Sequence, residues 1–467
     1  MLDIFIVFGY LILTLVLGVW VGRRVSSAED YGTGGRQYSA WVIFAAISSS
    51  FIGGGFTLGL AEKTFLYGLP FIIAICGFSF KELLIALLIA PRIQAFRTKL
   101  TIGDIMEHAF GKRSRIFTGI ASVLVCSGII GAQISACGSL IHIFLGPPPA
   151  IGALLAASII IIYSALGGMR SVIAVDIMHF CVFTVILPLI LIFGIQEVGG
   201  AHTFLKNLPE THTTLTGTLG LKSLLILFFS FFLGETLIPP YIQRLLIGKT
   251  IKNTMIGTFG SGLFSILIFF VVGFTGMAAL ILAPNLSPAS ALPYVIQTVM
   301  PMGAKGLAIA AMLAVIMSSV DSFLNSISLA CSHDILYPLN IIEKNKNHEL
   351  TVNRCITVVI GTIAIIISVS LSTSVDILLY SYQFWTPFIL TPFIAAILGI
   401  RSSDKAFFIS TFAGIGGVLL WNFVGGDSSK TLLDYALEGT LFGITLNSLT
   451  FILYHRFFTK RPLSEPI

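Results

Sequence analysis

Long apolar segments separated by short polar connections run through almost the whole chain. Apolar runs of about eighteen or more residues recur between Ile4 and Phe458, and a helix needs about 20 such residues to cross a bilayer core of roughly 30 Å. We therefore expect an all-α integral membrane protein with about thirteen transmembrane helices. The expected spans lie near residues 3–22, 41–67, 69–92, 113–145, 150–166, 171–198, 222–246, 252–283, 303–335, 352–372, 375–400, 405–425 and 437–458.

Composition excludes a water-soluble protein. Apolar residues make up 56% of the chain and charged residues only 10%, whereas soluble domains carry about 25% charged residues. The net charge of +6 comes from basic residues in short connections, so we expect no nucleic-acid partner. The six cysteines are scattered without metal-ligand or disulfide spacing, and the eight histidines are dispersed. We expect neither an enzyme nor an organic cofactor, and no obligate protein partner is evident.

The distribution of Lys and Arg predicts the orientation of the chain. An odd number of spans places the termini on opposite sides and divides the connections into two sets. Of the 27 Lys and Arg residues, four lie in one set, two lie inside expected spans and the remaining 21 lie in the other set. The four are Lys206, Lys222, Lys305 and Lys430, and the two are Lys63 and Lys81. Because basic connections stay in the cytoplasm, we expect the N-terminus outside and the C-terminus inside.

The connections are too short to hold a soluble domain. The longest covers about 199–221, so residues 1–467 are expected to form a single polytopic domain in a lipid bilayer. Such short connections favour a bacterial inner membrane.

Two of the expected spans contain residues that interrupt a helix. The second span contains three consecutive glycines, Gly53–Gly55, and the seventh contains Gly234 followed by Pro239 and Pro240. Glycines can also permit close helix packing, and prolines can simply produce a kink. The breaks lie five helices apart, however, and equivalent broken helices in inverted repeats mark the binding site of many transporters.

The spacing of the breaks therefore predicts a 5+5 inverted repeat formed by helices 2–6 and 7–11. The first repeat would cover 41–198 and the second 222–400. Residues 1–22 would add one preceding helix, and 405–458 would add two peripheral helices.

Ionisable residues inside the spans are functional candidates because burying charge in a membrane is costly. They are Glu62, Lys81, Glu82, Asp176, Glu235 and Asp321. Asp176, Asp321 and Glu62 lie near span ends and could instead be interfacial. Glu235 lies within the proline break, which favours a functional role. Lys81 and Glu82 are adjacent, so each needs a partner on another helix.

The ninth span carries a polar stripe. Ser318, Ser322, Asn325 and Ser326 share one helical face, and Ser319 lies beside it. Hydroxyl and carbonyl oxygens suit a monovalent cation, whereas a divalent ion would want more carboxylates. The same stripe could serve interhelical hydrogen bonding.

Three segments together resemble the sodium:solute symporter family. They are the Tyr163–His179 segment, with Gly167, Gly168 and Asp176, the segment Ala314–Ser322 of the ninth span, and Glu29–Arg36 in the first basic connection. The resemblance extends from about residue 1 to 400. It implies a leucine-transporter-like fold, alternating access and inward transport of a solute driven by sodium.

The resemblance also implies ligands for the coupling ion. One sodium would be bound by the backbone carbonyls of Ser49, Ile52 and Val315 and by the hydroxyls of Ser318 and Ser319. In members with a second sodium the signature aspartate takes part, which here is Asp176, together with Ser322. The chain departs from the signature at Val175, where threonine is usual, and at His179, where glutamine is usual. These departures leave open whether a second sodium site exists.

The solute is expected to bind between the two breaks. The second and seventh spans are most similar to the choline-transporter branch, but of the four tryptophans only Trp385 could contribute to an aromatic cage. We therefore expect a small zwitterion such as an amino acid, with glycine amides facing its anionic group. The expected solute-binding residues are Phe51, Gly53, Gly54, Gln133, Glu235, Tyr241 and Trp385.

Two other uses of the Lys81–Glu82 pair compete with this hypothesis. A proton-coupled or antiporter-like membrane subunit could use the pair as a proton relay, although such proteins place several charges in successive helices. Alternatively, the Lys81 ammonium could act as a tethered cation that supplements or replaces sodium.

Overall fold

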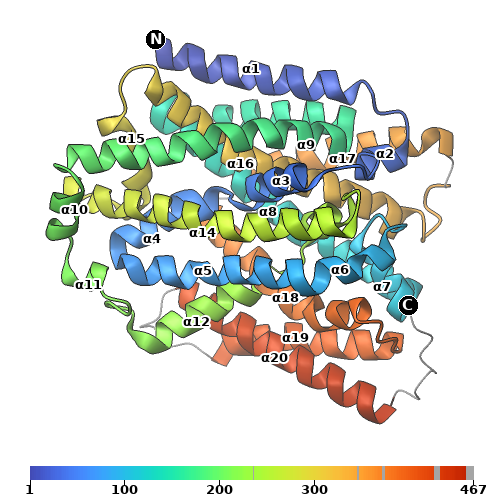
Figure 1. Ribbon diagram of the computed structural model, residues 1–467. Coiled ribbons are helices and arrows are strands. Elements are labelled where there is room, and N and C mark those ends of the chain that lie inside the picture. The colour runs from blue at the N-terminus through green and yellow to red at the C-terminus, as the bar shows by residue number, and fades with distance from the viewer. Residues whose placement is uncertain (235, 344–345, 371–373, 425–431, 459–467) are drawn as a thin grey trace.

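The protein is a bundle of helices that lie roughly along one common direction (Figure 1). The computed structural model describes residues 1–467 except 235, 344–345, 371–373, 425–431 and 459–467. Within the described residues, regular structure is helical, and the one extended pairing is an isolated bridge between Tyr38 and Gly248. The expectation of an all-α membrane fold is confirmed.

Ten long helices form most of the bundle. They are α1 (Leu2–Gly22), α5 (Leu69–Leu84), α8 (Lys112–Leu145), α9 (Pro149–Glu197), α14 (Ile251–Leu282), α16 (Ala304–Leu329), α17 (Lys346–Ser370), α18 (Ser374–Ile397), α19 (Asp404–Val424) and α20 (Leu432–Phe458). Two of these helices continue as π-helical turns, α5 into η2 (Ile85–Ile89) and α16 into η5 (Ala330–Leu336).

Shorter helices form the connections and the two interrupted spans. The connecting helices are α2 (Ala28–Thr33), α6 (Ala90–Ile93), η3 (Gln94–Phe96), α7 (Ile102–Phe110), α10 (Ala201–Asn207), α11 (Glu210–Thr213), η4 (Pro288–Ser290) and α15 (Ala291–Val299). The interrupted spans are α3 (Ala40–Phe51) with η1 (Gly55–Gly59) and α4 (Leu60–Tyr67), and α12 (Gly220–Leu233) with α13 (Pro239–Leu246).

By length and apolarity, eight of the described helices could cross a membrane, or nine if the bent pair α3 and η1–α4 is one span. Four further spans are expected from the sequence. One is the second half of α9, two correspond to α12 and the described part of α18, which are short apolar helices, and the last corresponds to α20, which is not among those counted above.

The two spans inside α9 meet at Gly168. This residue has φ 48° and ψ −137°, which a residue with a side chain rarely adopts. A Cβ atom at this position would lie only 2.4 Å from the carbonyl oxygen of Tyr31 in α2. Glycine therefore permits both the sharp kink and the close approach of the α2 connection.

Both expected helix breaks are present in the structure. The axes of α3 and of η1–α4 differ by 68°, and Ile52 to Gly54 form the bend between them. In the second interrupted span, α12 ends at Leu233 and α13 begins at Pro239, where proline is well suited to the first helical turn. Leu237 lies between them with φ 56°, a conformation that bulky residues adopt only where packing enforces it.

Helix α16 is the centre of the bundle. In its most apolar window 94% of the residues are buried, against 28–67% for the other candidate spans. It packs against α1, α3, α8, α9 and α13, so polar side chains on α16 face other helices and not lipid.

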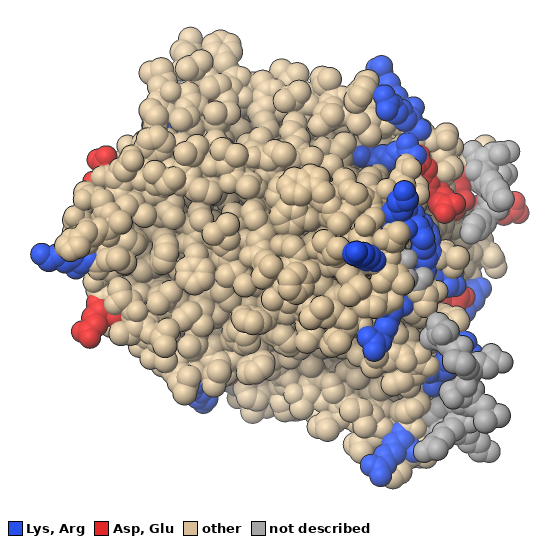
Figure 2. Space-filling model, viewed as in Figure 1, with Lys and Arg blue, Asp and Glu red and all other residues tan. Residues whose placement is uncertain are grey.

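Lys and Arg side chains gather at one end of the molecule in Figure 2. In the same view, this end carries α2, α6 and α7, and we call it the basic end. The chain begins at the opposite end, where α10, α11 and α15 also lie, and α20 runs toward the basic end (Figure 1). The sides between the two ends are tan in this view. Large apolar residues such as Phe5, Leu124 and Phe412 are exposed, as lipid contact requires.

Candidate functional site

The polar stripe of α16 meets the broken end of α3. The hydroxyl oxygens of Ser49 and Ser318 lie 2.6 Å apart, and the Ser319 hydroxyl donates to the carbonyl of Ser50 at 2.8 Å. A longer bond of 3.4 Å joins Ser319 to the carbonyl of Val315. Because α3 stops at Phe51, the carbonyls of its last turn lack the amides that would follow in a continuous helix. The structure thus brings together the residues expected to bind the first sodium, with Ile52 at the end of the helix.

The chemistry of this cluster fits a sodium ion. Ser49, Ser318 and Ser319 are at most 2% exposed, and their neighbours supply hydroxyl and carbonyl oxygens. These are hard ligands of low charge. Among the described residues, no group of three or more His, Cys, Asp and Glu residues could hold a metal ion. A monovalent cation therefore suits the cluster better than a transition metal.

A second cluster, centred on Asp176 of α9, adjoins the first. The carboxylate of Asp176 accepts hydrogen bonds from Ser318 and, at 3.2 Å, from Ser50. Nη2 of Arg244 donates to the same carboxylate at 2.7 Å and also to the hydroxyl of Ser322. The structure thus brings Asp176 and Ser322 together, and the guanidinium of Arg244 bridges them.

Asp321 lies on the other side of Ser322. The Tyr163 hydroxyl donates to the Asp321 carboxylate at 2.6 Å, and the Ser322 hydroxyl lies 3.0 Å from it. Asp176 and Asp321 are both fully buried, so neither is an interfacial residue. Two carboxylates and one guanidinium therefore lie in the core of the bundle, where each needs compensating bonds.

The stripe continues toward the basic end and ties α13 and α2 to α16. The Gln243 amide donates to the carbonyl of Gly32 at 2.6 Å and to Asn325 at 2.9 Å, and it accepts a bond from Ser326. This part of the stripe therefore makes interhelical hydrogen bonds, the role that was the alternative to an ion site. The part that meets α3 forms the hydroxyl cluster described above.

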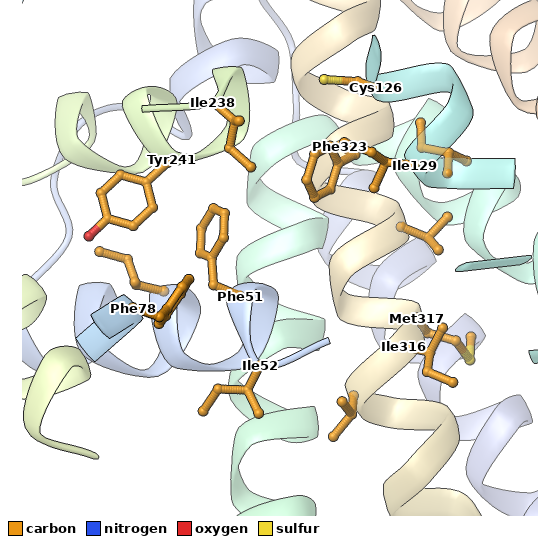
Figure 3. Close-up of a cluster of buried hydrophobic side chains, with 14 of the residues drawn as sticks. Phe51, Ile52, Phe78, Cys126, Ile129, Ile238, Tyr241, Ile316, Met317 and Phe323 are labelled. Atoms are coloured by element: carbon orange, nitrogen blue, oxygen red, sulfur yellow. The ribbon is translucent and has the colours of Figure 1, made fainter. Parts of the chain in front are cut away.

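The expected solute-binding residues form two neighbouring groups on the α3 break. In the first, the rings of Phe51 and Tyr241 lie 4.8 Å apart, with Phe78 of α5 close by in Figure 3. In the second, the Gln133 amide of α8 lies against the glycines of the bend. Cβ atoms built at Gly53 and Gly54 would lie 3.1 Å and 2.9 Å from its nitrogen and oxygen.

Trp385 of α18 contacts the second helix break and not the first. Its indole N–H donates to the carbonyl of Thr236 at 3.3 Å, and the neighbouring Thr386 hydroxyl donates to the carbonyl of Gly234. The two residues hold α18 against the interrupted backbone between α12 and α13. Glu235, the remaining expected solute-binding residue, lies outside the described residues.

Lys81 and Glu82 are both buried in α5, with exposures of 2% and 0%. The Lys81 ammonium lies 3.7 Å from the centre of the Phe78 ring, an arrangement typical of a cation–π contact. Both residues also have further interactions within the protein. The cation that contacts the signature aspartate is Arg244 and not Lys81.

The sequence interpretation missed the position of Arg244. It counted this arginine among the basic connections, whereas the structure buries it completely. In the structure, Arg244 follows Pro239 and Pro240 by about one helical turn and belongs to a helix, α13, that is buried at every position. Tyr163 was identified only as part of the signature, and its bond to Asp321 depends on the packing of α9 against α16.

Comparisons with known proteins identify the family to which the chain belongs. The sequence model of the sodium:solute symporter family matches residues 31–414. The chain is 26% identical to the sodium/sialic acid symporter SiaT of Proteus mirabilis over 76% of this chain and 75% of that protein. It is 23% identical to the sodium/glucose cotransporter of Vibrio parahaemolyticus over 96% and 90% of the two chains. It is also 23% identical to the osmoregulated proline transporter OpuE of Bacillus subtilis, over 91% and 89%.

Solved structures share the fold. A Na⁺-coupled sialic acid symporter in a substrate-bound outward-open state superposes with a TM-score of 0.85 at 21% identity, covering 97% of this chain and 98% of that chain. MhsT in complex with L-phenylalanine gives a TM-score of 0.59 at 14% identity, over 89% and 98%. The fold is therefore that of the leucine-transporter-like transporters. It is the family match, and not the fold, that makes the chain a transporter and not an enzyme. With most of its length matched by the family model, this protein belongs to the sodium:solute symporter family.

Proposed function

We propose that sodium binds where α16 meets the break in α3 and drives uptake of a small carboxylated solute. Sodium-coupled symport by alternating access is the activity of the family, and it favours symport over the antiporter-like alternative. The observation that carries the proposed site is the contact of Ser49, Ser318 and Ser319 at the end of a broken helix. The proposed ligands are their hydroxyls with the carbonyls of Ser49, Ile52 and Val315.

The expected topology supports this direction of transport. The basic end would lie in the cytoplasm by the positive-inside rule, which places the N-terminus outside and the C-terminus inside. The two interrupted spans would belong to inverted repeats over 41–198 and 222–400. A site at both breaks would then lie near the membrane midplane, where it can open alternately to either side. The bacterial relatives favour a bacterial inner membrane.

The proposed class of solute is inferred from the amide groups beside the α3 break. Gly53 and Gly54 directly precede the η1 segment, at a helix start where backbone amides lack helical partners, and the Gln133 side-chain amide lies against them. Such a group of donors suits a carboxylate. Phe51 and Tyr241 provide apolar contact for the rest of the solute. Sialic acid and proline, which relatives carry by name, share a carboxylate, whereas glucose has none.

Thermal unfolding of the purified protein tests the sodium site. Replacing choline chloride with sodium chloride at equal ionic strength is expected to raise the melting temperature, because a ligand that binds only the folded state stabilises it by mass action. The double variant Ser318→Ala with Ser319→Ala should lose this shift. The matched control combines Ser122→Ala and Ser410→Ala, two buried serines whose hydroxyls bond within their own helices. If the α16 double variant kept the full sodium-dependent shift in melting temperature, sodium would not bind at this site.

Uptake into proteoliposomes under an inward sodium gradient tests the solute class. Sialic acid or proline is expected to be accumulated and glucose is not. Gln133→Leu should lower uptake of the carboxylated solute by about tenfold, the effect of losing roughly 1.4 kcal/mol of binding, while the sodium-dependent thermal shift remains. Gln297→Leu is the control, since Gln297 is exposed and lies on α15. Equal uptake by the two variants, or preferred uptake of glucose, would contradict the carboxylate assignment.

A further inference from the structure

Aromatic rings from four segments of the chain meet directly after the α3 break. The ring of Phe56 in η1 lies 4.7 Å from the ring of Phe78 in α5. It stacks on the ring of Phe269 in α14 at 5.6 Å, and the ring of Phe231 in α12 lies 6.5 Å away. We call these four residues the aromatic wall. They adjoin the glycines against which the Gln133 amide lies.

Part of the aromatic wall is accessible. Phe56 and Phe231 are partly exposed, and Gly55, which precedes Phe56 at the start of η1, is exposed. Backbone exposed at a break within the membrane must line a water-filled cavity or be covered by protein, because lipid offers no hydrogen bonds. Gly55 and the free side of the Phe56 ring therefore face the path by which a solute reaches the break.

Apolar side chains also border the amides that would hold the carboxylate. A Cβ atom at Gly54, which lies against Gln133, would be 3.2 Å from Cγ1 of Ile316 on α16. On α8, Ile129 precedes Gln133 by one helical turn and has no exposed surface. A solute bound at these amides would therefore have apolar neighbours on α8 and α16 as well as in η1.

Most polar side chains of the described residues at the two breaks are already bonded within the protein. The Thr57 hydroxyl donates to the carbonyl of Gly53 at 3.1 Å, and Trp385 and Thr386 donate to carbonyls of the second break. The Tyr241 hydroxyl, by contrast, is buried and has no hydrogen-bond partner among the described residues. These residues thus offer few free donors beyond the amides that suit the carboxylate.

The charged pair in α5 adds no polar surface beside Phe56. Lys81 and Glu82 are 2% and 0% exposed, and both have interactions within the protein. The Lys81 ammonium lies 3.7 Å from the centre of the Phe78 ring. With so little surface exposed, neither charge is presented to a solute that contacts Phe56.

This surroundings favours one kind of carboxylated solute over another. Each hydroxyl group of a solute that leaves water and finds no partner weakens binding. Ring or alkyl carbons, in contrast, gain from contact with Phe56 and its neighbours. A polyhydroxylated acid therefore matches the site poorly, and an acid with a carbon skeleton free of hydroxyl groups matches it well.

We infer that the solute is a compact carboxylate with an apolar body, and that Phe56 selects it against polyhydroxylated acids. The inference rests on the proposed carboxylate site and narrows the proposed class of solute. Of the carboxylated solutes that relatives carry by name, proline fits it and sialic acid does not.

Two acids with the same carbon skeleton test the inference. They are cyclohexanecarboxylate and quinate, its polyhydroxylated analogue. Thermal unfolding of the purified full-length protein in sodium chloride is followed at rising concentrations of each acid. Cyclohexanecarboxylate is expected to raise the melting temperature with an apparent Kd at least tenfold lower than that of quinate. The shift should weaken in choline chloride, which separates binding at a sodium-coupled site from partition of the acid into detergent.

A variant of the aromatic wall provides a separate measurement. Phe56→Ala is expected to lower the affinity for cyclohexanecarboxylate at least tenfold. Phe412→Ala is the matched control, because Phe412 lies on α19 and is exposed on the outside of the bundle, so it should keep the wild-type affinity. The comparison of the two acids on the wild type stands even if Phe56→Ala does not fold.

The outcomes separate this inference from the proposed function. Quinate binding as tightly as cyclohexanecarboxylate, or wild-type affinity in Phe56→Ala, would overturn the inference and leave the carboxylate assignment in place. A shift with sialic acid but not with cyclohexanecarboxylate would overturn it as well. Absence of a shift with any carboxylated probe, proline included, would instead contradict the proposed function.

Discussion

Replacing Arg115 with methionine is expected to lower the free energy of unfolding by about 3–5 kcal/mol, the typical cost of removing one partner from a buried ion pair. The Arg115 guanidinium lies 2.8 Å from Asp104, 2.6 Å from Glu107 and 3.1 Å from Asp334, and it donates to the carbonyl of His333 at 2.7 Å. Asp334 has no exposed surface. The variant leaves three carboxylates close together without their cation.

The adjacent Arg113 offers a matched control on the same helix. Its side chain is 82% exposed and lies 3.8 Å from Asp404, which is itself 39% exposed. Exposed pairs of this kind contribute between zero and about 1 kcal/mol, so Arg113→Met should unfold almost like the wild type. Chemical unfolding in one detergent, followed by tryptophan fluorescence, compares the two variants. Equal losses would show that Arg115 is not the residue that joins α7 to the end of α16.

Replacing Gly53 with alanine is expected to reduce sodium affinity at least tenfold, which corresponds to about 1.4 kcal/mol of binding free energy. A Cβ atom at this position would lie 2.6 Å from the hydroxyl oxygen of Ser319, a proposed sodium ligand. The hydroxyl must move, or the bend between α3 and η1 must open. Either change separates the ligands on α16 from the carbonyls at the end of α3.

Gly59→Ala distinguishes this effect from a general loss of flexibility. Gly59 belongs to the same bent span, but a Cβ atom there would meet nothing within 4 Å. The sodium affinity of the Gly59→Ala variant should therefore match that of the wild type. The measurement is sodium-dependent thermal stabilisation over a range of sodium concentrations for both variants. If Gly53→Ala retained the wild-type sodium affinity, Ser319 would not be a ligand.

The fold could be predicted from the sequence because membrane spans depend on simple local properties. Apolar length determines where a helix can cross the bilayer, and the Gly53–Gly55 run marks a break that the structure contains. The spans expected at 150–166 and 171–198 place a break within α9, and the structure has its kink between them, but the backbone conformation of that kink could not be predicted. The two spans are joined through Gly168, whose unusual backbone conformation depends on contact with Tyr31 in a distant connection.

The candidate site was only partly predictable. The serines of α16 stand out because their polarity and spacing interrupt an apolar helix. The position of Arg244 could not be seen, because an arginine near the end of an apolar run has the same local pattern whether it faces water or a buried carboxylate. Only the packing of α13 against α9 and α16 distinguishes these cases. The role of Trp385 likewise depends on contact between α18 and the second break.

A cation that is covalently part of the chain returns with the empty carrier and contributes nothing to the driving force of transport. With a tenfold sodium gradient and a potential of 100 mV, one sodium ion releases about 3.7 kcal/mol, the sum of roughly 1.4 and 2.3 kcal/mol. This limits the accumulation of a zwitterion to a factor of roughly 400 for each sodium ion carried with it. An anion carried with one sodium moves no net charge, and the sodium gradient alone would then accumulate it only about tenfold. The charge of the solute and the number of sodium ions carried with it would thus decide how steep a gradient the cell can maintain, and the guanidinium of Arg244 adds nothing to it.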